Sequence, residues 1–384
     1  MKKHTRFVGL DVHAATIAVA VAEGGRDGEV RSLGKIPNRP ESVRKLVKKL
    51  RAGCDELRVC YEAGPCGYAL YWQLTELGVE CVVIAPTLVP KKSGDRVKTD
   101  RLDAEKLARC FRSGDLTAVW VPDKAHEALR DLVRARLAAK KDQLRARHRL
   151  SKFLLRLGRR PPQEVKAWGA KYMAWVRALA FEFKPQEAAF SDYLNEVDHA
   201  RDRIARLESA IDASIETAPE SLRAVIAGLQ ALRGVAKLTA VTTAVEVGTF
   251  SRFEHPRQLM GYSGAVPSEY SSGGSTKRFA ITHAGNSHLR HVIIEAAWAY
   301  RFRPSVTGKL RERQRGLSAE VNAIGLKAQH RLHERYVRML AKGKLKQKVV
   351  TAIGRELLGF MWAIGKQVEK EVAASQRVKQ PAAA

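Results

Sequence analysis

Four carboxylates stand at the ends of predicted secondary-structure elements, where side chains from separate elements can meet. Asp11 ends one apolar run, and Glu62 ends another. Asp100 and Asp103 open a predicted helix and, being three residues apart, share one face of its first turn. Converging carboxylates repel one another unless cations lie among them, and such hard oxygen ligands favour Mg²⁺ or Mn²⁺. A pair of these metal ions is the usual device for phosphodiester chemistry.

Each of these carboxylates also has an ordinary structural explanation. Asp11 can be a turn residue, and Glu62 can be a solvated strand end. Asp100 can cap the N-terminus of its helix, with Asp103 at the third helical position. The metal-site hypothesis therefore depends on all four residues falling where a single fold would bring them together.

A second candidate for chemistry is the segment Ser271-Ser272-Gly273-Gly274, which Lys277 and Arg278 follow. A serine followed by flexible backbone can present its Oγ to a phosphate, while nearby cations offset the charge that builds on the phosphate oxygens. The whole stretch 267–290 is predicted as a Gly/Ser-rich loop that leads into a helix over 288–300. Taken alone, such a segment is also what an ordinary surface loop looks like.

The first 120 residues predict an α/β unit that could position the carboxylates. Apolar runs predict strands over 7–10, 16–22, 29–36, 57–61 and 79–84, and helical spacing predicts helices over 40–51, over 65–77 and from about residue 100. The order βββαβαβα is that of the ribonuclease H fold, whose sheet order is 3-2-1-4-5. Its first and fourth strands are parallel neighbours, so Asp11 and Glu62 would emerge side by side. A doubly wound nucleotide-binding domain does not begin with three strands joined by tight turns.

The rest of the chain is predicted to be mostly helical. Long helices are expected over 124–157 and roughly 187–216, the second with a heptad-like apolar stripe, packed antiparallel as a coiled coil. Residues 158–186 between them match no motif. Gly234 lies between two helical stretches and resembles the turn of a helix-hairpin-helix element that holds a DNA phosphate, but an ordinary helix C-cap explains it equally well. The predicted domains are a metal-binding domain (1–123), a helical region (124–228), a C-terminal domain (229–372) and a disordered tail (373–384).

Net charge is the strongest signal in the composition. The chain has 68 Lys and Arg against 40 Asp and Glu, a net charge of +28. Two windows, 124–160 and 301–348, hold 21 of these 28 charges. So large an excess predicts a polyanionic partner, with nucleic acid held chiefly by phosphate contacts along both windows. The alternative is that Lys and Arg merely solvate helices.

The sequence also bears on the compartment. Five cysteines without a paired CxxC pattern argue against a disulfide framework and a zinc site. The N-terminus has no signal-peptide pattern, and no uncharged apolar stretch reaches the length of a membrane span. We therefore expect a cytoplasmic protein without a membrane partner.

Six motifs make the chain resemble the DEDD insertion-sequence transposases, a family related to the pilin-gene DNA invertases. They occur in family order over about residues 5–365 and are Gly9-Leu-Asp11-Val-His13, Tyr61-Glu62-Ala-Gly64, Lys98-Thr-Asp100-Arg-Leu-Asp103-Ala, Leu232-Arg-Gly234-Val, Pro267-Ser-Glu-Tyr-Ser-Ser272-Gly273-Gly274 and Ile281-Thr-His-Ala-Gly285-Asn286-Ser-His-Leu-Arg290. The resemblance implies a RuvC-like ribonuclease H domain with a metal site of Asp11, Glu62, Asp100 and Asp103. It also implies a coiled-coil middle and a C-terminal transposase domain whose serine, matching Ser272, becomes covalently joined to DNA. Ser271 stands next to it as the neighbouring candidate.

The resemblance predicts a site-specific DNA recombinase that mobilises its own insertion sequence and depends on Mg²⁺ or Mn²⁺. Its partners would be donor and target DNA, a guide (bridge) RNA and further copies of itself, from a dimer to a tetramer. The residues expected to contact nucleic acid are Arg145, Arg147, Arg149, Lys152, Lys277, Arg278 and Arg290. One alternative is a RuvC-like junction-resolving nuclease that uses water, and another is a non-catalytic nucleic-acid binder. An actin-like or sugar-kinase ATPase is disfavoured because the glycine-rich phosphate loop expected after Asp11 is missing.

Overall fold

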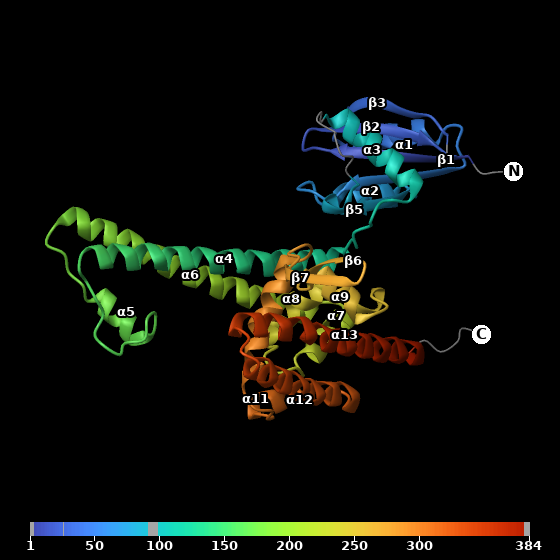
Figure 1. The fold of residues 1–384 in the computed structure, drawn as a ribbon. Helices are drawn as coiled ribbons and strands as arrows, with labels where there is room; N and C mark the ends of the chain where they lie inside the picture. The colour runs from blue at the N-terminus through green and yellow to red at the C-terminus, as the bar shows by residue number, and fades with distance from the viewer. Residues whose placement is uncertain (1–3, 26, 91–98, 380–384) are drawn as a thin grey trace. The chain divides into compact units, whose positions relative to one another are not determined.

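A computed structural model of the protein describes residues 4–25, 27–90 and 99–379 (Figure 1). The chain divides into two compact units, Met1–Val121 and Pro122–Ala384, so the predicted helical region and C-terminal domain both belong to the second unit. Within the described ranges, no helix has both the length and the apolar content that crossing a bilayer requires.

A five-stranded mixed sheet forms the centre of the first unit. Its strands are β1 (Thr5–Val12), β2 (Thr16–Glu23), β3 (Val30–Pro37), β4 (Glu56–Glu62) and β5 (Glu80–Ile84). They lie in the order β3-β2-β1-β4-β5, in which β1 runs antiparallel to β2 and parallel to β4. The predicted strand order is therefore confirmed, and the sheet is consistent with a ribonuclease H-like domain.

Helices cover both faces of this sheet. On one face, α1 (Pro40–Arg51) and α2 (Ala69–Glu76) bury apolar side chains against Ile17, Val19 and Val21 of β2. On the other face, α3 (Asp100–Ser113) packs against the alanines that alternate with them in β2. Because both faces of β2 are covered, its sequence is apolar from Ile17 to Ala22. The alanines on the second face allow α3 to approach the sheet closely.

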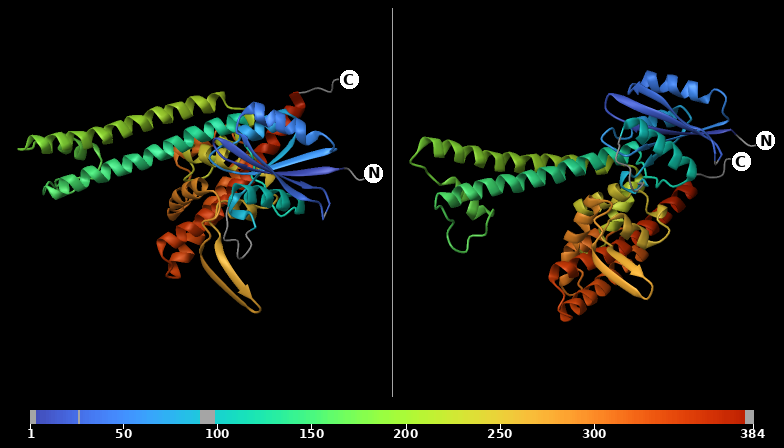
Figure 2. Two further views of the ribbon diagram at one scale, coloured as in Figure 1. Left: turned by 90° about the horizontal axis from the view of Figure 1, so that it is seen from above. Right: turned by 45° about the horizontal axis from the view of Figure 1, so that its top comes forward.

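Two long helices, α4 (Lys124–Arg156) and α6 (Lys184–Thr217), form an arm of the second unit (Figure 2). They pack antiparallel, as predicted, because residue numbers rise along α4 while they fall along α6 in the ion pairs Arg136–Glu208, Asp142–Arg203 and Arg149–Glu196. Side chains from both helices pack together along the arm. The coiled-coil interpretation of this pair remains a prediction.

Residues 158–186, which match no sequence motif, give the end of this arm an apolar core of its own. They include the short helix α5 (Ala170–Arg177). The ring of Trp168 lies 5.0 Å from that of Tyr172, and the ring of Phe181 lies 4.8 Å from that of Phe190 on α6. The aromatic residues of this segment therefore join α4 to α6 where the chain turns back.

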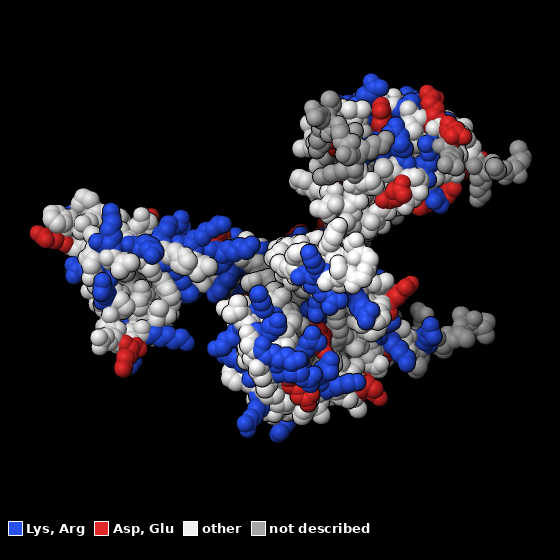
Figure 3. Space-filling view, in the orientation of Figure 1, with Lys and Arg blue, Asp and Glu red and all other residues white. Residues whose placement is uncertain are grey.

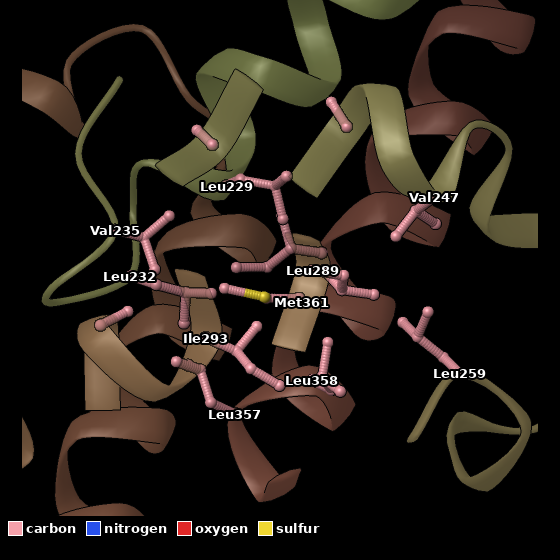
Figure 4. Close-up of a cluster of buried hydrophobic side chains, with 14 of the residues drawn as sticks. Leu229, Leu232, Val235, Val247, Leu259, Leu289, Ile293, Leu357, Leu358 and Met361 are labelled. Atoms are coloured by element: carbon pink, nitrogen blue, oxygen red, sulfur yellow. The ribbon is translucent and has the colours of Figure 1, made fainter. Parts of the chain in front are cut away.

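The rest of the second unit is a helical body around the last long helix. Its helices are α7 (Glu220–Leu229), α8 (Lys237–Val247), α9 (Pro256–Tyr262), α10 (Ser287–Ala297), α11 (Gly308–Arg313), α12 (Ala319–Ala341) and α13 (Lys346–Lys379). Short 3₁₀ helices occur at Pro86–Leu88 of the first unit and at Phe250–Arg252 and Trp298–Arg301 of the body. Helix α13 packs against α7, α9, α10 and α12. Leu229, Leu289, Ile293, Leu357 and Met361 meet in the core that results (Figure 4).

Three sequence predictions for the second unit need correction. Gly234 does not cap α7, whose C-cap is Gln230; a Cβ at position 234 would lie 2.4 Å from the carbonyl oxygen of Ala296, so packing against α10 accounts for the glycine. The stretch predicted as a loop contains a β-hairpin of β6 (Pro267–Ser272) and β7 (Ser275–Ile281). The disordered tail predicted from residue 373 is helical as far as Lys379, and residues 380–384 lie outside the described ranges.

Candidate active site

The first two predicted carboxylates lie at one edge of the sheet, where β1 and β4 end side by side. Leu10 pairs with Tyr61 in the parallel register, so the next residues, Asp11 and Glu62, leave adjacent strands together. Both line a pocket of about 590 Å³, which His13 also lines. Asp11 is half-buried and Glu62 is exposed. The side-by-side placement expected from the sequence is therefore present in the structure.

Helix α3 carries the other two carboxylates to the same region. A Cβ at Gly9 of β1 would lie 2.4 Å from the carbonyl oxygen of Ala104, so only glycine allows α3 to pack this closely on the strand that carries Asp11. Asp100 is the first residue of α3, and the helix cap is Thr99, whose side chain accepts a hydrogen bond from the amide of Leu102. The alternative explanation of Asp100 as an N-cap is therefore wrong. Lys98, which begins this sequence motif, lies outside the described residues.

His13 joins the carboxylates of β1 and α3. Its Nε2 lies 3.3 Å from Oδ2 of Asp11 and 3.6 Å from Oδ1 of Asp100. One ligand atom from each of these three residues lies within 4.8 Å of the other two. Lys35 of β3 also reaches this group, with its Nζ 2.6 Å from Oδ2 of Asp100. A histidine and a lysine without a predicted role thus belong to the site.

The charges at this edge influence one another. Burial raises the pKa of Asp11, the nearby His13 opposes this, and the negative charges of Asp100 and Asp103 raise the pKa of Asp11 further. Asp103 thus acts electrostatically on Asp11. The hydrogen bond from Lys35 holds the pKa of Asp100 below its ordinary value. The crowded carboxylates therefore form a region where added positive charge is favourable.

The donors at this edge fit a divalent cation. Asp11 and Asp100 supply carboxylate oxygens, His13 supplies a ring nitrogen within the same small volume, and Glu62 lines the adjoining pocket. Hard divalent cations prefer such oxygen-rich sets. Burial is the main cause of the raised pKa of Asp11, with the charges of Asp100 and Asp103 adding to it, so a cation bound here would favour the charged form of Asp11.

Ser272, the predicted nucleophile, ends β6 next to a two-residue turn. It pairs with Ser275 across the turn formed by Gly273 and Gly274, and Gly273 has a φ of 56°, which glycine adopts without strain. Residues 269–280 of the hairpin are all exposed. The serine hydroxyl is thus presented to solvent from a tight turn, in place of the loop expected from the sequence.

The two cations that follow Ser272 in the sequence lie on opposite faces of the hairpin. Lys277 pairs with Tyr270, and side chains alternate along a strand, so Lys277 shares its face with Ser272. Arg278 lies on the other face, where its Nε is 2.9 Å from Oε2 of Glu269. Lys277 is therefore the cation better placed to act together with Ser272.

A buried carboxylate, Glu246 of α8, connects α4 of the arm to the start of α10, which follows the hairpin in the chain. Arg134 of α4 donates two hydrogen bonds of 2.8 Å to its carboxylate oxygens, and Asn286 donates a third of 2.7 Å. Asn286 also caps α10 by accepting a hydrogen bond from the amide of Leu289. The sequence alone did not predict this network, since nothing in the local pattern pairs residues so far apart in the chain.

The other residues predicted to contact nucleic acid have protein partners in the structure, apart from Lys152, which lies exposed on α4. Arg145 contacts Asp142 at 3.2 Å, and Arg149 contacts Glu196 at 2.9 Å. The Arg147 guanidinium lies 5.1 Å from the centre of the Trp168 ring. Arg290 is half-buried and donates a 2.7 Å hydrogen bond to the carbonyl oxygen of Ser263. Arg145 and Arg149 remain exposed beside their acidic partners, so they stay available to phosphates.

Family models match both units of this chain. A model described as a transposase, of the DEDD type of IS110, matches residues 8–158. A second model, described as transposase IS116/IS110/IS902 family, matches residues 227–310. The first match includes all four predicted carboxylates, and the second includes the hairpin of Ser272.

Individual relatives agree with these models. A protein named putative transposase y4qE from Sinorhizobium fredii (strain NBRC 101917 / NGR234) is 46% identical over 365 residues, which cover 95% of this chain and 89% of that protein. The transposase for insertion sequence element IS1533 from Leptospira borgpetersenii is 32% identical over 349 residues, which cover 89% of this chain and 99% of that protein. The pilin gene-inverting protein of Moraxella lacunata is 26% identical over 72% of this chain and 69% of its own length.

Proposed function

Because this chain belongs to the IS116/IS110/IS902 family of transposases, we propose that it cuts and rejoins DNA at defined sites through a covalent serine intermediate. Asp11, Glu62, Asp100 and Asp103 form the metal site of a RuvC-like domain, and Ser272 is the nucleophile. The single observation that carries this function is the meeting of Asp11, His13 and Asp100 at the sheet edge that Glu62 also lines.

The first unit positions the carboxylates. When bound, Mg²⁺ or Mn²⁺ would stabilise the charge that builds on the phosphate oxygens in the transition state. Strands β1 and β4 fix Asp11 and Glu62 at one edge, and the close packing of α3 on Gly9 fixes Asp100 and Asp103. His13 orients Asp11 through its 3.3 Å contact. Lys35 lowers the pKa of Asp100 but pairs with its Oδ2, so a cation that binds Asp100 through this oxygen must displace the lysine.

The second unit supplies the nucleophile. Ser272 Oγ forms a bond to phosphorus, the bond from phosphorus to one deoxyribose oxygen breaks, and that oxygen takes up a proton. The serine phosphodiester conserves the energy of the broken bond, so a sugar hydroxyl of another strand can attack it and release the serine. Support comes from the exposed turn that presents Ser272 and from Lys277 on the same face, whose charge favours a phosphate there.

The basic surfaces bind the nucleic-acid partners. Lys and Arg side chains gather along the α4–α6 arm and over the helical body of the second unit (Figure 3). They bind donor and target DNA, and a guide (bridge) RNA, chiefly through phosphates. Several copies of the chain, from two to four, assemble on these partners. Support for the RNA and for the assembly comes from the family resemblance of the sequence motifs and from the net charge of +28.

Replacement of Asp11 by asparagine tests the metal site. Purified Asp11→Asn protein should lose Mg²⁺-dependent strand cleavage of DNA that carries the element's ends, because a ligand charge is removed while the shape is kept. Calorimetry should show weaker Mg²⁺ binding and unchanged affinity for DNA. Asp27→Asn is the matched control, since Asp27 is an exposed carboxylate of the same unit away from the site.

Undiminished cleavage by Asp11→Asn would remove Asp11 from the metal site. Equal losses in Asp11→Asn and Asp27→Asn would point to a general effect of charge on the unit. Cleavage that needs Asp11 but leaves free DNA ends, without protein attached, would favour the metal-dependent junction-resolving nuclease over the serine recombinase.

A further inference from the structure

One face of the β6–β7 hairpin brings aromatic and cationic side chains to Ser272. The register pairs Tyr270 with Lys277 and Ser272 with Ser275. The register shift between Pro267 and Glu269 leaves Phe279 and Ala280 opposite Ser268, which shares its face with Tyr270, so Phe279 is placed on this face too. This face, which we call the serine face, consists of Tyr270, Ser272, Ser275, Lys277 and Phe279.

The serine face exposes two large aromatic side chains to solvent. Tyr270 is 67% exposed and Phe279 is 61% exposed, and both belong to a hairpin whose residues 269–280 are all exposed. A two-stranded hairpin is marginally stable alone, and adjacent exposed apolar side chains on a soluble protein usually mark a surface that contacts a partner. The two rings therefore need an explanation beyond the packing of this chain.

The charge of the serine face favours a polyanionic partner. The serine face carries the positive charge of Lys277 and no carboxylate, because Glu269 projects to the opposite face and pairs there with Arg278. Aromatic rings beside a cation form a surface on which nucleobases stack while the cation contacts a phosphate. A second copy of this chain, with its own net charge of +28, is a poorer electrostatic match than a polyanion.

We propose that the serine face is a nucleobase-stacking site, on which Tyr270 and Phe279 hold unpaired DNA bases next to Ser272 while Lys277 contacts the backbone. This inference rests on the proposed function in so far as Ser272 is the nucleophile. Ser272 follows Tyr270 by two residues, about 7 Å along the strand. A nucleotide stacked on Tyr270 thus has a phosphate within reach of the serine hydroxyl. The rings position the DNA strand, and the serine reacts with it.

The test is the salt dependence of binding to single-stranded DNA. All variants carry Ser272→Ala, so that no covalent product forms, and the probe is a fluorescent single-stranded DNA of mixed sequence, measured by anisotropy. Phosphate contacts determine the slope of log Kd against log salt, whereas stacking contributes to the affinity extrapolated to 1 M salt. Tyr270→Ala and Phe279→Ala should each weaken that extrapolated affinity about 5- to 100-fold without changing the slope.

Control variants separate the ring from its surroundings. Tyr270→Phe should keep the affinity, because it keeps the ring. Lys277→Gln should reduce the slope by about 0.7, the value for one contact to a single strand. Phe183→Ala is the matched control, since Phe183 is 59% exposed but lies outside the hairpin. An RNA of the same sequence and the matching duplex complete the set, and we expect the largest effect on single-stranded DNA.

Several results would overturn the inference. Unchanged extrapolated affinity in both alanine variants would exclude stacking, and an accompanying change in sedimentation would assign the serine face to contacts between copies of the chain. Equal losses in Phe183→Ala, or a larger effect on RNA than on DNA, would also contradict it. Failure of the proposed function looks different: a covalent adduct that persists in Ser272→Ala would move the nucleophile and leave these binding results as they are.

Discussion

Replacing Arg134 with alanine should destabilise the second unit more than replacing Glu246 with glutamine, although both changes break the same ion pair. The Glu246 side chain is 1% exposed, whereas that of Arg134 is 41% exposed. Removing Arg134 leaves a buried carboxylate that keeps its hydrogen bond from Asn286 but loses the arginine that balances its charge, with His288 as the remaining basic group that acts on it. Removing the charge of Glu246 leaves an arginine that water can solvate.

The size of the Arg134→Ala effect has a ceiling, because the buried carboxyl group can take up a proton. The ordinary pKa of this glutamate is 4.5. Protonating it at pH 7 therefore costs about 3.4 kcal/mol, at 1.36 kcal/mol for each pH unit. We expect Arg134→Ala to cost about 3 kcal/mol at pH 7, close to this ceiling and within the range for broken buried ion pairs. Glu246→Gln should lower the free energy of unfolding by about 1 to 2 kcal/mol, because it weakens charged hydrogen bonds but leaves no unbalanced charge buried.

The two variants should also respond differently to pH. In the wild type, burial works against the charge of Glu246, but hydrogen bonds from Arg134 and Asn286 outweigh it and lower its pKa. A lowered pKa stabilises the fold above pH 4.5, and this contribution is lost as the pH falls through the folded-state value. In Arg134→Ala the pKa should be raised instead. The loss of unfolding free energy in this variant should therefore shrink between pH 7 and pH 5, by at most about 2.7 kcal/mol for one group over two pH units.

Urea unfolding followed by circular dichroism at pH 7 and pH 5 measures both effects. A Glu246→Gln variant less stable than Arg134→Ala at pH 7 would refute the reasoning from burial. If the loss of unfolding free energy in Arg134→Ala grows as the pH falls, the unbalanced buried charge does not belong to Glu246.

Three further predictions concern the metal site, its packing and the arm. Lys35→Gln should bind Mg²⁺ more tightly in calorimetry, because it removes a positive charge 2.6 Å from Asp100; weaker binding would show that Lys35 supports the metal site. Gly9→Ala should destabilise the first unit by about 1 to 3 kcal/mol and weaken Mg²⁺ binding, because its Cβ would meet the backbone of α3. Gly261→Ala, with nothing within 4 Å of the added Cβ, should do neither, and equal unfolding midpoints for the two would contradict the packing argument. Neutralising four exposed or partly exposed cations of α4 together, Arg145, Arg147, Arg149 and Lys152, should flatten the slope of log affinity for duplex DNA against log salt. We expect a change of about 0.9 for each phosphate that the helix no longer binds. An unchanged slope would mean that these side chains only face solvent.

The sequence could predict those site residues whose positions are fixed by the end of a single strand. Asp11 and Glu62 each end an apolar run, so the strand order alone places them together. Lys35 could not be predicted in this way, because its approach to Asp100 depends on the register of β3 against β2, which shifts between Val19 and Ala20. His13 stood in the motif with Asp11, and its spacing of two residues was the available signal.

In the second unit the sequence was informative about helices and less so about what joins them. The serines on either side of Gly273 and Gly274 were the signal for a two-residue hairpin turn, but their polar character suggested a loop. The ion pair of Arg134 with Glu246 joins residues 112 positions apart, which no local pattern encodes. The aromatic core at the end of the arm likewise depends on Phe181 meeting Phe190 across a turn.

The most direct test of the central claim is the fate of the DNA end after cleavage. Labelled DNA carrying the element's ends is incubated with the protein and Mg²⁺ and then separated on a denaturing gel. A serine nucleophile predicts a band shifted by the mass of the protein, stable to heat and detergent, in the wild type and in Ser271→Ala but absent in Ser272→Ala. Cleaved ends without a shifted band in the wild type, or an adduct that persists in Ser272→Ala and disappears in Ser271→Ala, would contradict the assignment of Ser272.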